Sequence, residues 1–130
     1  MRLLLDTHIA IWAAKNPERI AEAVRLDIED AGNEVVVSVV AIWEIAIKRQ
    51  LDRNDPPPFS ATEAIDAFSR LGFQLLDVTA THAAKVETLP LHHGDPFDRL
   101  MVAQALCEPM RLITHDKRLT AYTDLVTYVP

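Results

Sequence analysis

The stretch of sequence that decides the fold runs from residue 34 to residue 51 and reads EVVVSVVAIWEIAIKRQL. Its first part, Glu34–Ser38, is rich in β-branched valine, and a short apolar run of this kind predicts a buried strand. Ser38 is a preferred N-cap residue, so the residues that follow it, Val39–Leu51, are predicted to form a helix. A buried strand that passes directly into a helix is typical of α/β folds.

The same alternation of strand and helix continues on both sides of this stretch. The strands are continuous apolar runs, which indicates a parallel sheet covered by helices on both faces. We therefore expect a three-layer α/β/α sandwich with a central, mainly parallel sheet of about five strands. Further strands are predicted at Arg2–Leu5, Phe73–Val78, Arg111–Thr114 and Leu125–Val129. Further helices are predicted at His8–Lys15 after a Thr7 cap, Glu18–Ala31, Ser60–Leu71, Thr79–Leu89 and Asp95–Cys107, with a short turn or helix at Lys117–Ala121.

Length and composition limit the class of protein. The chain has 130 residues, of which 49% are apolar and 25% charged, and these values indicate one globular domain over residues 1–130. The single cysteine, Cys107, excludes an internal disulfide framework and a cysteine-rich zinc site, and it fits a reducing compartment, so we expect a cytoplasmic location. The longest uncharged run of mainly apolar residues, Val35–Trp43, has nine residues, against the ~18 that a membrane span needs. Asp6 comes too early for a signal peptide.

The charge balance narrows the functional classes further. The 13 lysines and arginines against 19 aspartates and glutamates give a net charge of −6, which argues against nucleic-acid binding by simple neutralisation of the phosphate backbone. Aromatic residues make up 6% of the chain, which is too few for a base-stacking platform. The balance is compatible with an enzyme that holds cations in an acidic pocket and acts on phosphates there.

Four carboxylates stand at positions that need an explanation. Asp6 ends the first predicted strand and Asp116 follows the fourth, and ligands of parallel α/β sheets bind beyond the carboxyl ends of the strands. Glu44 lies inside a predicted helix that is apolar on most sides, where an unpaired carboxylate is costly. Asp98 opens the apolar stretch of another predicted helix, three residues after its expected N-cap, Asp95.

Each of these carboxylates also has an ordinary structural explanation. An aspartate at the end of a strand is common as a turn or cap residue, and a carboxylate in the first turn of a helix interacts favourably with the helix dipole. Asp6 fits the first role, Asp95 and Asp98 fit the second, Glu44 pairs with Lys48 four residues later, and Asp116 fits a solvated turn.

Taken together, the four carboxylates favour a metal site. Several carboxylates at one end of a sheet repel one another unless a hard divalent cation neutralises them. Mg²⁺ or Mn²⁺ prefers oxygen ligands and retains waters that act as nucleophiles. The chain has no H-E-x-x-H or C-x-x-C spacing for zinc, no glycine-rich phosphate loop and no G-x-S-x-G nucleophile motif. The pattern therefore predicts metal-assisted hydrolysis of a phosphodiester.

Histidine and basic residues supply further candidates. His8 and His115 lie next to the predicted pocket, where they are candidates to bind a substrate phosphate or to help ligate a softer metal. His82 is expected on a helix surface, and His92 and His93 in a solvated loop. The candidate phosphate contacts are Lys48, Arg49, Arg99, Lys117 and Arg118, for which surface ion pairs are an equally good explanation.

Four motifs occur in order along nearly the whole chain: LLLDTH at 3–8, SVVAIWEIAIK at 38–48, HHGDPFDRLMVAQA at 92–105 and LITHD at 112–116. In their order and spacing they resemble the PIN-domain family, and more closely the VapC-type toxins of bacterial toxin–antitoxin pairs. The stretch 95–105 is the most specific part of the resemblance. The resemblance implies an endoribonuclease that depends on Mg²⁺ or Mn²⁺ and hydrolyses RNA phosphodiester bonds.

The same resemblance implies which residues form the site. It assigns the catalytic and metal-binding acids to Asp6, Glu44, Asp98 and Asp116, with Asp98 rather than Asp95 facing the metal. Family members usually form homodimers and are silenced by a cognate antitoxin. We therefore expect an RNA substrate, an antitoxin partner, a homodimer and no membrane association.

Three further residues complete the expected site. The resemblance gives Thr114 a hydrogen bond to the acidic cluster. Thr114, Arg99 and Lys117 are our candidate contacts to the substrate.

Two other functions are compatible with parts of the pattern. Haloacid-dehalogenase-like phosphotransferases also begin with an apolar strand that ends in aspartate, but they usually carry a second aspartate two positions later, where this chain has His8. A non-catalytic module that uses its acids to hold a basic partner is the other alternative, and the complete set of four acids argues against it.

Overall fold

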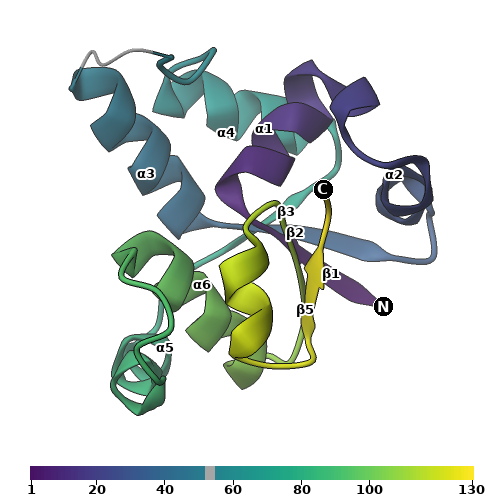
Figure 1. The fold of residues 1–130 in the computed structure, drawn as a ribbon. Coiled ribbons are helices and arrows are strands. Elements are labelled where there is room, and N and C mark those ends of the chain that lie inside the picture. The colour runs from purple at the N-terminus through teal and green to yellow at the C-terminus, as the bar shows by residue number, and fades with distance from the viewer. Residues whose placement is uncertain (52–54) are drawn as a thin grey trace.

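A single five-stranded sheet forms the centre of the molecule (Figure 1). The computed structural model describes residues 1–51 and 55–130. All neighbouring strands pair in parallel, in the order β3-β2-β1-β4-β5. This confirms the expected parallel sheet. The strands are β1 (Arg2–Leu5), β2 (Glu34–Ser38), β3 (Gln74–Leu76), β4 (Arg111–Thr114) and β5 (Val126–Tyr128).

Helices cover both faces of this sheet, as the three-layer prediction requires. Because successive strand residues point to opposite faces, Leu3 and Leu5 pack into one core with α1 to α4, and Leu4 packs into a second core with α6. Figure 1 shows α1, α3 and α4 on one side of the sheet and α5 and α6 on the other. The helices are α1 (Thr7–Lys15), α2 (Glu22–Glu29), α3 (Val39–Gln50), α4 (Ala61–Arg70), α5 (Ala80–Lys85) and α6 (Pro96–Cys107).

The order of the strands determines where a site can form. The chain runs outward from β1 through β2 to β3, and then returns to the other side of β1 with β4 and β5. The direction therefore reverses between β1 and β4, and the crevice beyond their carboxyl ends is the usual ligand position in such sheets. Asp6 follows β1 and Asp116 follows β4 closely, so the topology brings both to this crevice.

Helix caps follow the sequence signals closely, with one exception. Ser38 caps α3 by accepting from the Val40 amide, and Ser60 and Glu63 form the predicted capping box of α4. The cap of α1 is Asp6 rather than Thr7, because Asp6 still has extended backbone and its Oδ1 accepts the Ile9 amide at 2.9 Å. This shift by one residue frees the Thr7 hydroxyl for another partner.

Some element boundaries differ from the prediction. The helix expected over residues 18–31 is a short 3₁₀ turn, Pro17–Arg19, followed by α2, because Ile20 adopts extended backbone and buries its side chain in the core. The helix expected over residues 79–89 is α5 followed by a second 3₁₀ turn, Val86–Thr88. A third 3₁₀ turn, Lys117–Ala121, occupies its predicted place. In the ranges 1–51 and 55–130, no helix has both the length and the hydropathy to cross a membrane.

Candidate active site

The four predicted acids line one pocket of about 300 Å³ at the carboxyl ends of the strands. Asp6 and Asp116 come from the ends of β1 and β4, Glu44 from the middle of α3, and Asp98 from the first turn of α6. These residues lie up to 110 positions apart in the sequence, and the fold brings them together around the strand-order reversal. Asp95 lines the same pocket.

Asp6 lines the pocket and accepts three hydrogen bonds from the protein. It is buried, its Oδ1 accepts the Ile9 amide, and its Oδ2 accepts both the Thr114 hydroxyl and, at 3.2 Å, the His115 amide. Burial raises the pKa of Asp6, although these hydrogen bonds and the nearby His8 partly offset the effect. The predicted bond from Thr114 to the acidic cluster is thus present.

Glu44 has two partners that fix its carboxylate toward the pocket. Its Oε1 accepts the hydroxyl of Thr7 at 2.6 Å, and its Oε2 accepts from the ammonium of Lys48, one helical turn later on α3. The pairing with Lys48 agrees with the ordinary explanation of this residue. The partly exposed position that this explanation requires is wrong, however, because Glu44 is only 3% exposed.

Asp98 carries the strongest electrostatic signature of the pocket. Asp95 caps α6, accepting the amides of Phe97 at 2.8 Å and Asp98 at 3.3 Å, so it is committed to the helix terminus as predicted. Burial raises the pKa of Asp98 to about 7, with further contributions from the negative charges of Asp95, Asp6 and Glu44 and an opposing one from His93. A carboxylate whose pKa is raised in this way, in a cleft beside other carboxylates, marks a candidate functional site.

His93 is a site residue that sequence reasoning missed. Its Nε2 lies 3.0 Å from Asp98 Oδ2 and 3.2 Å from Asp116 Oδ2, and its side chain is 7% exposed, so the expected solvated position is wrong. Tyr122 fixes the loop, because its hydroxyl accepts the His93 amide and donates to the His93 carbonyl. The sequence signal for it is its place two residues before the N-cap of α6, close in the chain to the first turn that carries Asp98.

Asp116 is the most accessible of the four acids. Arg118 binds both of its oxygens, with Nε 3.0 Å from Oδ1 and Nη2 2.8 Å from Oδ2. The Arg118 guanidinium holds the pKa of Asp116 below its usual value, although partial burial opposes this effect. Asp116 is therefore ionised under conditions in which Asp98 is partly protonated.

The predicted substrate contacts separate into two groups. Lys117 and Arg118 line the acidic pocket together with Lys48. Arg99 does not, because it is buried and its guanidinium donates to the carbonyls of Val86 and Leu89, both at 3.2 Å.

Two other expected contacts also have structural partners. Arg49 donates to the carbonyl of Pro57 at 3.1 Å. Thr114 is fully buried beneath Asp6, where it supports the acids instead of facing a substrate.

The other histidines divide in the same way. His8 and His115 line the pocket as expected. His82 is 1% exposed, so the predicted helix-surface position is wrong: its Nδ1 faces the Thr79 amide at 3.1 Å, and its Nε2 lies 2.7 Å from Glu108 Oε2.

The donor set fits a divalent cation. Ligand atoms of His93, Asp98 and Asp116 lie within 4.8 Å of one another, and the carboxylates of Asp6 and Glu44 line the same pocket. Oxygen-rich sites of this kind suit Mg²⁺ and Mn²⁺. A cation would also offset the repulsion that, in addition to burial, raises the pKa of Asp98.

Known proteins share this arrangement of the chain. The family model described as PIN domain matches residues 3–125. The chain is 32% identical over 122 residues to Ribonuclease VapC22 of Mycobacterium tuberculosis, which covers 92% of this chain and 91% of that protein. Its fold is similar to that of VapBC2 from Rickettsia felis bound to a DNA fragment from their promoter, with a TM-score of 0.71 and 14% identity over 100% of both chains. It is also similar to a toxin–antitoxin complex from Klebsiella pneumoniae, with a TM-score of 0.64 and 16% identity over 96% of this chain and 95% of that one.

Proposed function

The chain belongs to the PIN-domain family and, within it, to the VapC ribonucleases, and we propose that its acidic pocket hydrolyses RNA phosphodiester bonds with a bound divalent cation. The observation that supports this proposal most strongly is the meeting of four carboxylates in one pocket, one of them with its pKa raised to about 7. Asp6, Glu44, Asp98 and Asp116 are the proposed catalytic and metal-binding residues, and Mg²⁺ or Mn²⁺ is the proposed ion.

The protein's own residues prepare the pocket for such a substrate. When bound, the cation would supply a water of lowered pKa and positive charge for the scissile phosphate. Thr114 and the His115 amide hold one oxygen of Asp6, and Thr7 holds one oxygen of Glu44, so neither carboxylate needs to reorient when the ion arrives. His93 orients Asp98 and Asp116 in the same manner.

Basic side chains at the pocket suit a phosphate. Lys48, Lys117 and Arg118 line it, and their charges act in the same space as the acids. Lys48 and Arg118 are paired with Glu44 and Asp116, so a phosphate oxygen would share these cations with the carboxylates. Lys117 is exposed at the rim and is the proposed direct contact to the backbone of the RNA.

The proposal includes a protein partner and an assembly. One of the similar solved structures is a toxin–antitoxin complex, so we propose that a cognate antitoxin neutralises this chain. A homodimer of the free toxin and a cytoplasmic location belong to the same proposal. Light scattering at micromolar concentration tests the dimer, and a species of only 14.6 kDa would contradict it.

The deciding experiment measures cleavage of total cellular RNA by the purified chain. We expect cleavage with Mg²⁺ or Mn²⁺, none with EDTA, and a melting temperature that rises when Mn²⁺ is added, because the ion binds only the folded state. Full activity of a metal-free preparation would contradict the proposed chemistry. Mapping the cleaved ends would identify the class of RNA.

The phosphotransferase alternative predicts a covalent intermediate on Asp6. Such enzymes usually carry a second aspartate two positions after the nucleophile, where this chain has His8. Incubation with beryllium fluoride tests this alternative, because a phosphoaspartate enzyme would form a stable mimic of its intermediate and a nuclease would not.

A further inference from the structure

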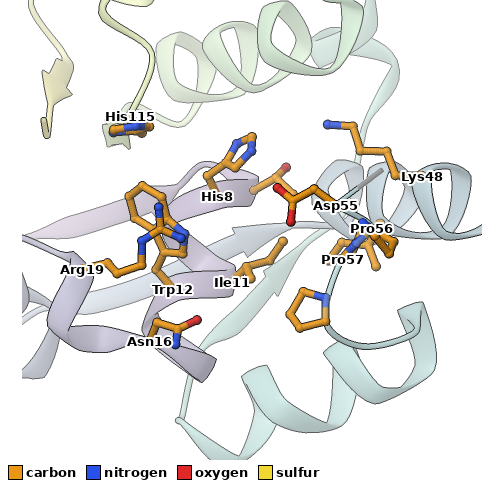
Figure 2. A pocket seen from close by; sticks show the side chains of 13 residues that line it. His8, Ile11, Trp12, Asn16, Arg19, Lys48, Asp55, Pro56, Pro57 and His115 are labelled. Atoms are coloured by element: carbon orange, nitrogen blue, oxygen red, sulfur yellow. The ribbon is translucent and has the colours of Figure 1, made fainter. Parts of the chain in front are cut away.

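A second pocket, of about 470 Å³, adjoins the acidic one (Figure 2). The two pockets share His8, Lys48 and His115 as lining residues, so they form a continuous depression at the carboxyl end of the sheet. The second pocket contains none of the four acids, and the carboxylate that lines it is that of Asp55. Its chemistry is therefore separate from the proposed cleavage step, although it lies within reach of the same bound molecule.

The wall of the second pocket is built around Trp12 and Arg19. The guanidinium carbon of Arg19 lies 4.3 Å from the centroid of the Trp12 ring, and Figure 2 shows the Arg19 side chain lying across that ring. His115 packs against the ring edge-on at 4.7 Å. Trp12 is only 7% exposed, because Arg19 covers its ring. A ligand in this pocket would therefore contact the Arg19 guanidinium and not the indole.

The side chains of Arg19 and Asn16 have polar groups without protein partners among the described residues. Within residues 1–51 and 55–130, no carboxylate lies within the 4.0 Å of an ion pair with Arg19, and the side-chain amide of Asn16 forms no hydrogen bond. Both residues line the pocket. In a chain of net charge −6, a stacked arginine without a paired carboxylate is a local exception to the overall charge.

We propose that this second pocket is a nucleotide subsite, which binds the RNA residue next to the scissile phosphate, with its base stacked on Arg19. The proposal rests on the ribonuclease function proposed above. Unpaired RNA bases are commonly stacked on guanidinium planes, and the Trp12 ring holds this plane in one orientation. The amide of Asn16 offers both a donor and an acceptor to a base edge.

The shared residues explain how a single RNA strand would reach both pockets. Lys48, His8 and His115 line both pockets, so an RNA strand that occupies both would pass these side chains. Lys48 would then hold a backbone phosphate while the base enters the second pocket. A single stacking position of this kind would hold one unpaired base without an aromatic platform, for which the chain has too few aromatic residues.

The first test combines an abasic substrate with Arg19→Gln. A cleavable RNA oligonucleotide is made with an abasic residue at each position on either side of the scissile phosphate. For the unmodified protein, removal of one flanking base should lower kcat/KM roughly ten-fold. Arg19→Gln should lower kcat/KM of the intact RNA by a similar factor, through KM, and should lose nothing more with the abasic RNA. The matched control is Arg70→Gln, because Arg70 lies on α4 in an exposed pair with Asp66 and should leave the whole profile unchanged.

The second test does not depend on cleavage. In Trp43→Phe, Trp12 is the remaining tryptophan of the chain, and adenosine, cytidine and uridine are titrated in EDTA while its fluorescence is recorded. At least one nucleoside should quench Trp12 saturably, and Arg19→Gln should abolish that quenching. Saturable quenching by a protein that cleaves no RNA would retain the subsite and overturn the proposed nuclease function.

Other results would overturn the subsite while retaining the nuclease. These are an abasic profile that Arg19→Gln does not change, or the absence of saturable quenching by every nucleoside. A loss of antitoxin affinity in Arg19→Gln with unchanged RNA kinetics would likewise show that the pocket receives a protein side chain instead of a base.

Discussion

Two buried histidines of this molecule each contact a carboxylate, yet their surroundings differ completely. His82 lies 2.7 Å from Glu108, and His93 lies 3.0 Å from Asp98, with side chains that are 1% and 7% exposed. Judged by burial and pairing alone, the two histidines are equivalent. They lie on the same side of the sheet, in or next to the helices α5 and α6.

The difference lies in the number of carboxylates around each histidine. Glu108 Oε1 also lies 3.9 Å from Nη1 of Arg2, so the negative charge of the Glu108 carboxylate is compensated by a neighbouring cation. His93 contacts a second carboxylate, Asp116, and Asp98 experiences three further negative charges that help to raise its pKa. Crowding of like charges, and not burial of a polar group, therefore distinguishes the candidate active site from a structural contact.

The largest expected effect is on RNA cleavage, when the charge of the carboxylate beside His93 is removed and compared with removal of the charge beside His82. Asp98→Asn should lower RNA cleavage roughly 100-fold or more, a loss of about 2.7 kcal/mol of transition-state stabilisation, because an amide is a poor ligand for a hard cation. Its melting temperature in EDTA at pH 8 should be unchanged or higher, since one of several crowded charges is gone. Asp6→Asn and Glu44→Gln should also lose cleavage.

The matched control for this charge is Glu108→Gln. It should lower the free energy of unfolding by about 1 kcal/mol and leave cleavage per folded molecule unchanged. Cleavage rates and melting temperatures measured on the same preparations separate the two patterns. An Asp98→Asn protein that is destabilised but fully active would return Asp98 to a simple role at the N-terminus of α6.

Exchanging the histidines themselves sharpens the same comparison. His93→Gln should weaken Mn²⁺ binding roughly ten-fold, because residues that orient metal-binding carboxylates commonly contribute this much. His82→Gln should instead cost about 1–3 kcal/mol of stability, because Glu108 and the Thr79 amide lose a buried partner. Mn²⁺ titration by electron paramagnetic resonance and urea denaturation provide the two readouts. Equal effects of both variants on Mn²⁺ affinity would contradict the distinction.

The pH dependence of stability tests the raised pKa of Asp98, which burial and the neighbouring carboxylates produce together. The pKa of Asp98 is about 7 in the folded state, above its unfolded value of 3.8. Asp98 therefore contributes fully to the free energy of unfolding below about pH 4, and this contribution is lost as the pH rises through about 7. The metal-free protein should thus lose on the order of a few kcal/mol between these limits relative to Asp98→Asn. Asp116, with its lowered pKa, acts in the opposite direction and only in acid.

Denaturation of both proteins at a series of pH values measures the difference between them. A difference that does not depend on pH between 4 and 8 would contradict the raised pKa of Asp98. The same proton competes with the ion, so the apparent Mn²⁺ affinity should increase with pH up to about 7.

The smallest expected effects on cleavage distinguish Lys117 from Arg99, which are equivalent candidates for substrate contacts when judged from the sequence. Lys117→Ala should reduce cleavage only a few-fold, because an exposed lysine contributes a modest, screened interaction with a phosphate. Arg99→Met should leave cleavage per folded molecule unchanged but destabilise the fold by about 1–3 kcal/mol, because the carbonyls of Val86 and Leu89 lose their donor. A strong salt-dependent loss of cleavage in Arg99→Met would show that Arg99 reaches the substrate after all.

Much of the fold could be predicted because its signals are local. The Ser60–Glu63 capping box, the Asp95–Pro96 start of α6 and the valines of β2 each depend on residues within about four positions of one another. Boundaries failed where a distant contact overrides the local preference. Ile20, which separates the 3₁₀ turn from α2, is extended because its side chain fills the core and not because its own sequence breaks a helix.

The candidate site divides along the same line. The positions of Asp6, Glu44, Asp98 and Asp116 in their elements follow from the sequence, because a strand end, a helix interior and a helix first turn are each readable locally. The groups that contact these four acids cannot be read from the sequence in the same way. Thr114 meets Asp6 across 108 residues of chain, and His93, Arg99 and His82 reach their partners through loop paths and helix packing that no local pattern encodes. The sequence by itself therefore determined the helices and strands and the acids that they carry. The packing of β1 against β4 and of α6 against the sheet decided which polar groups meet in the candidate site and which are buried in the core.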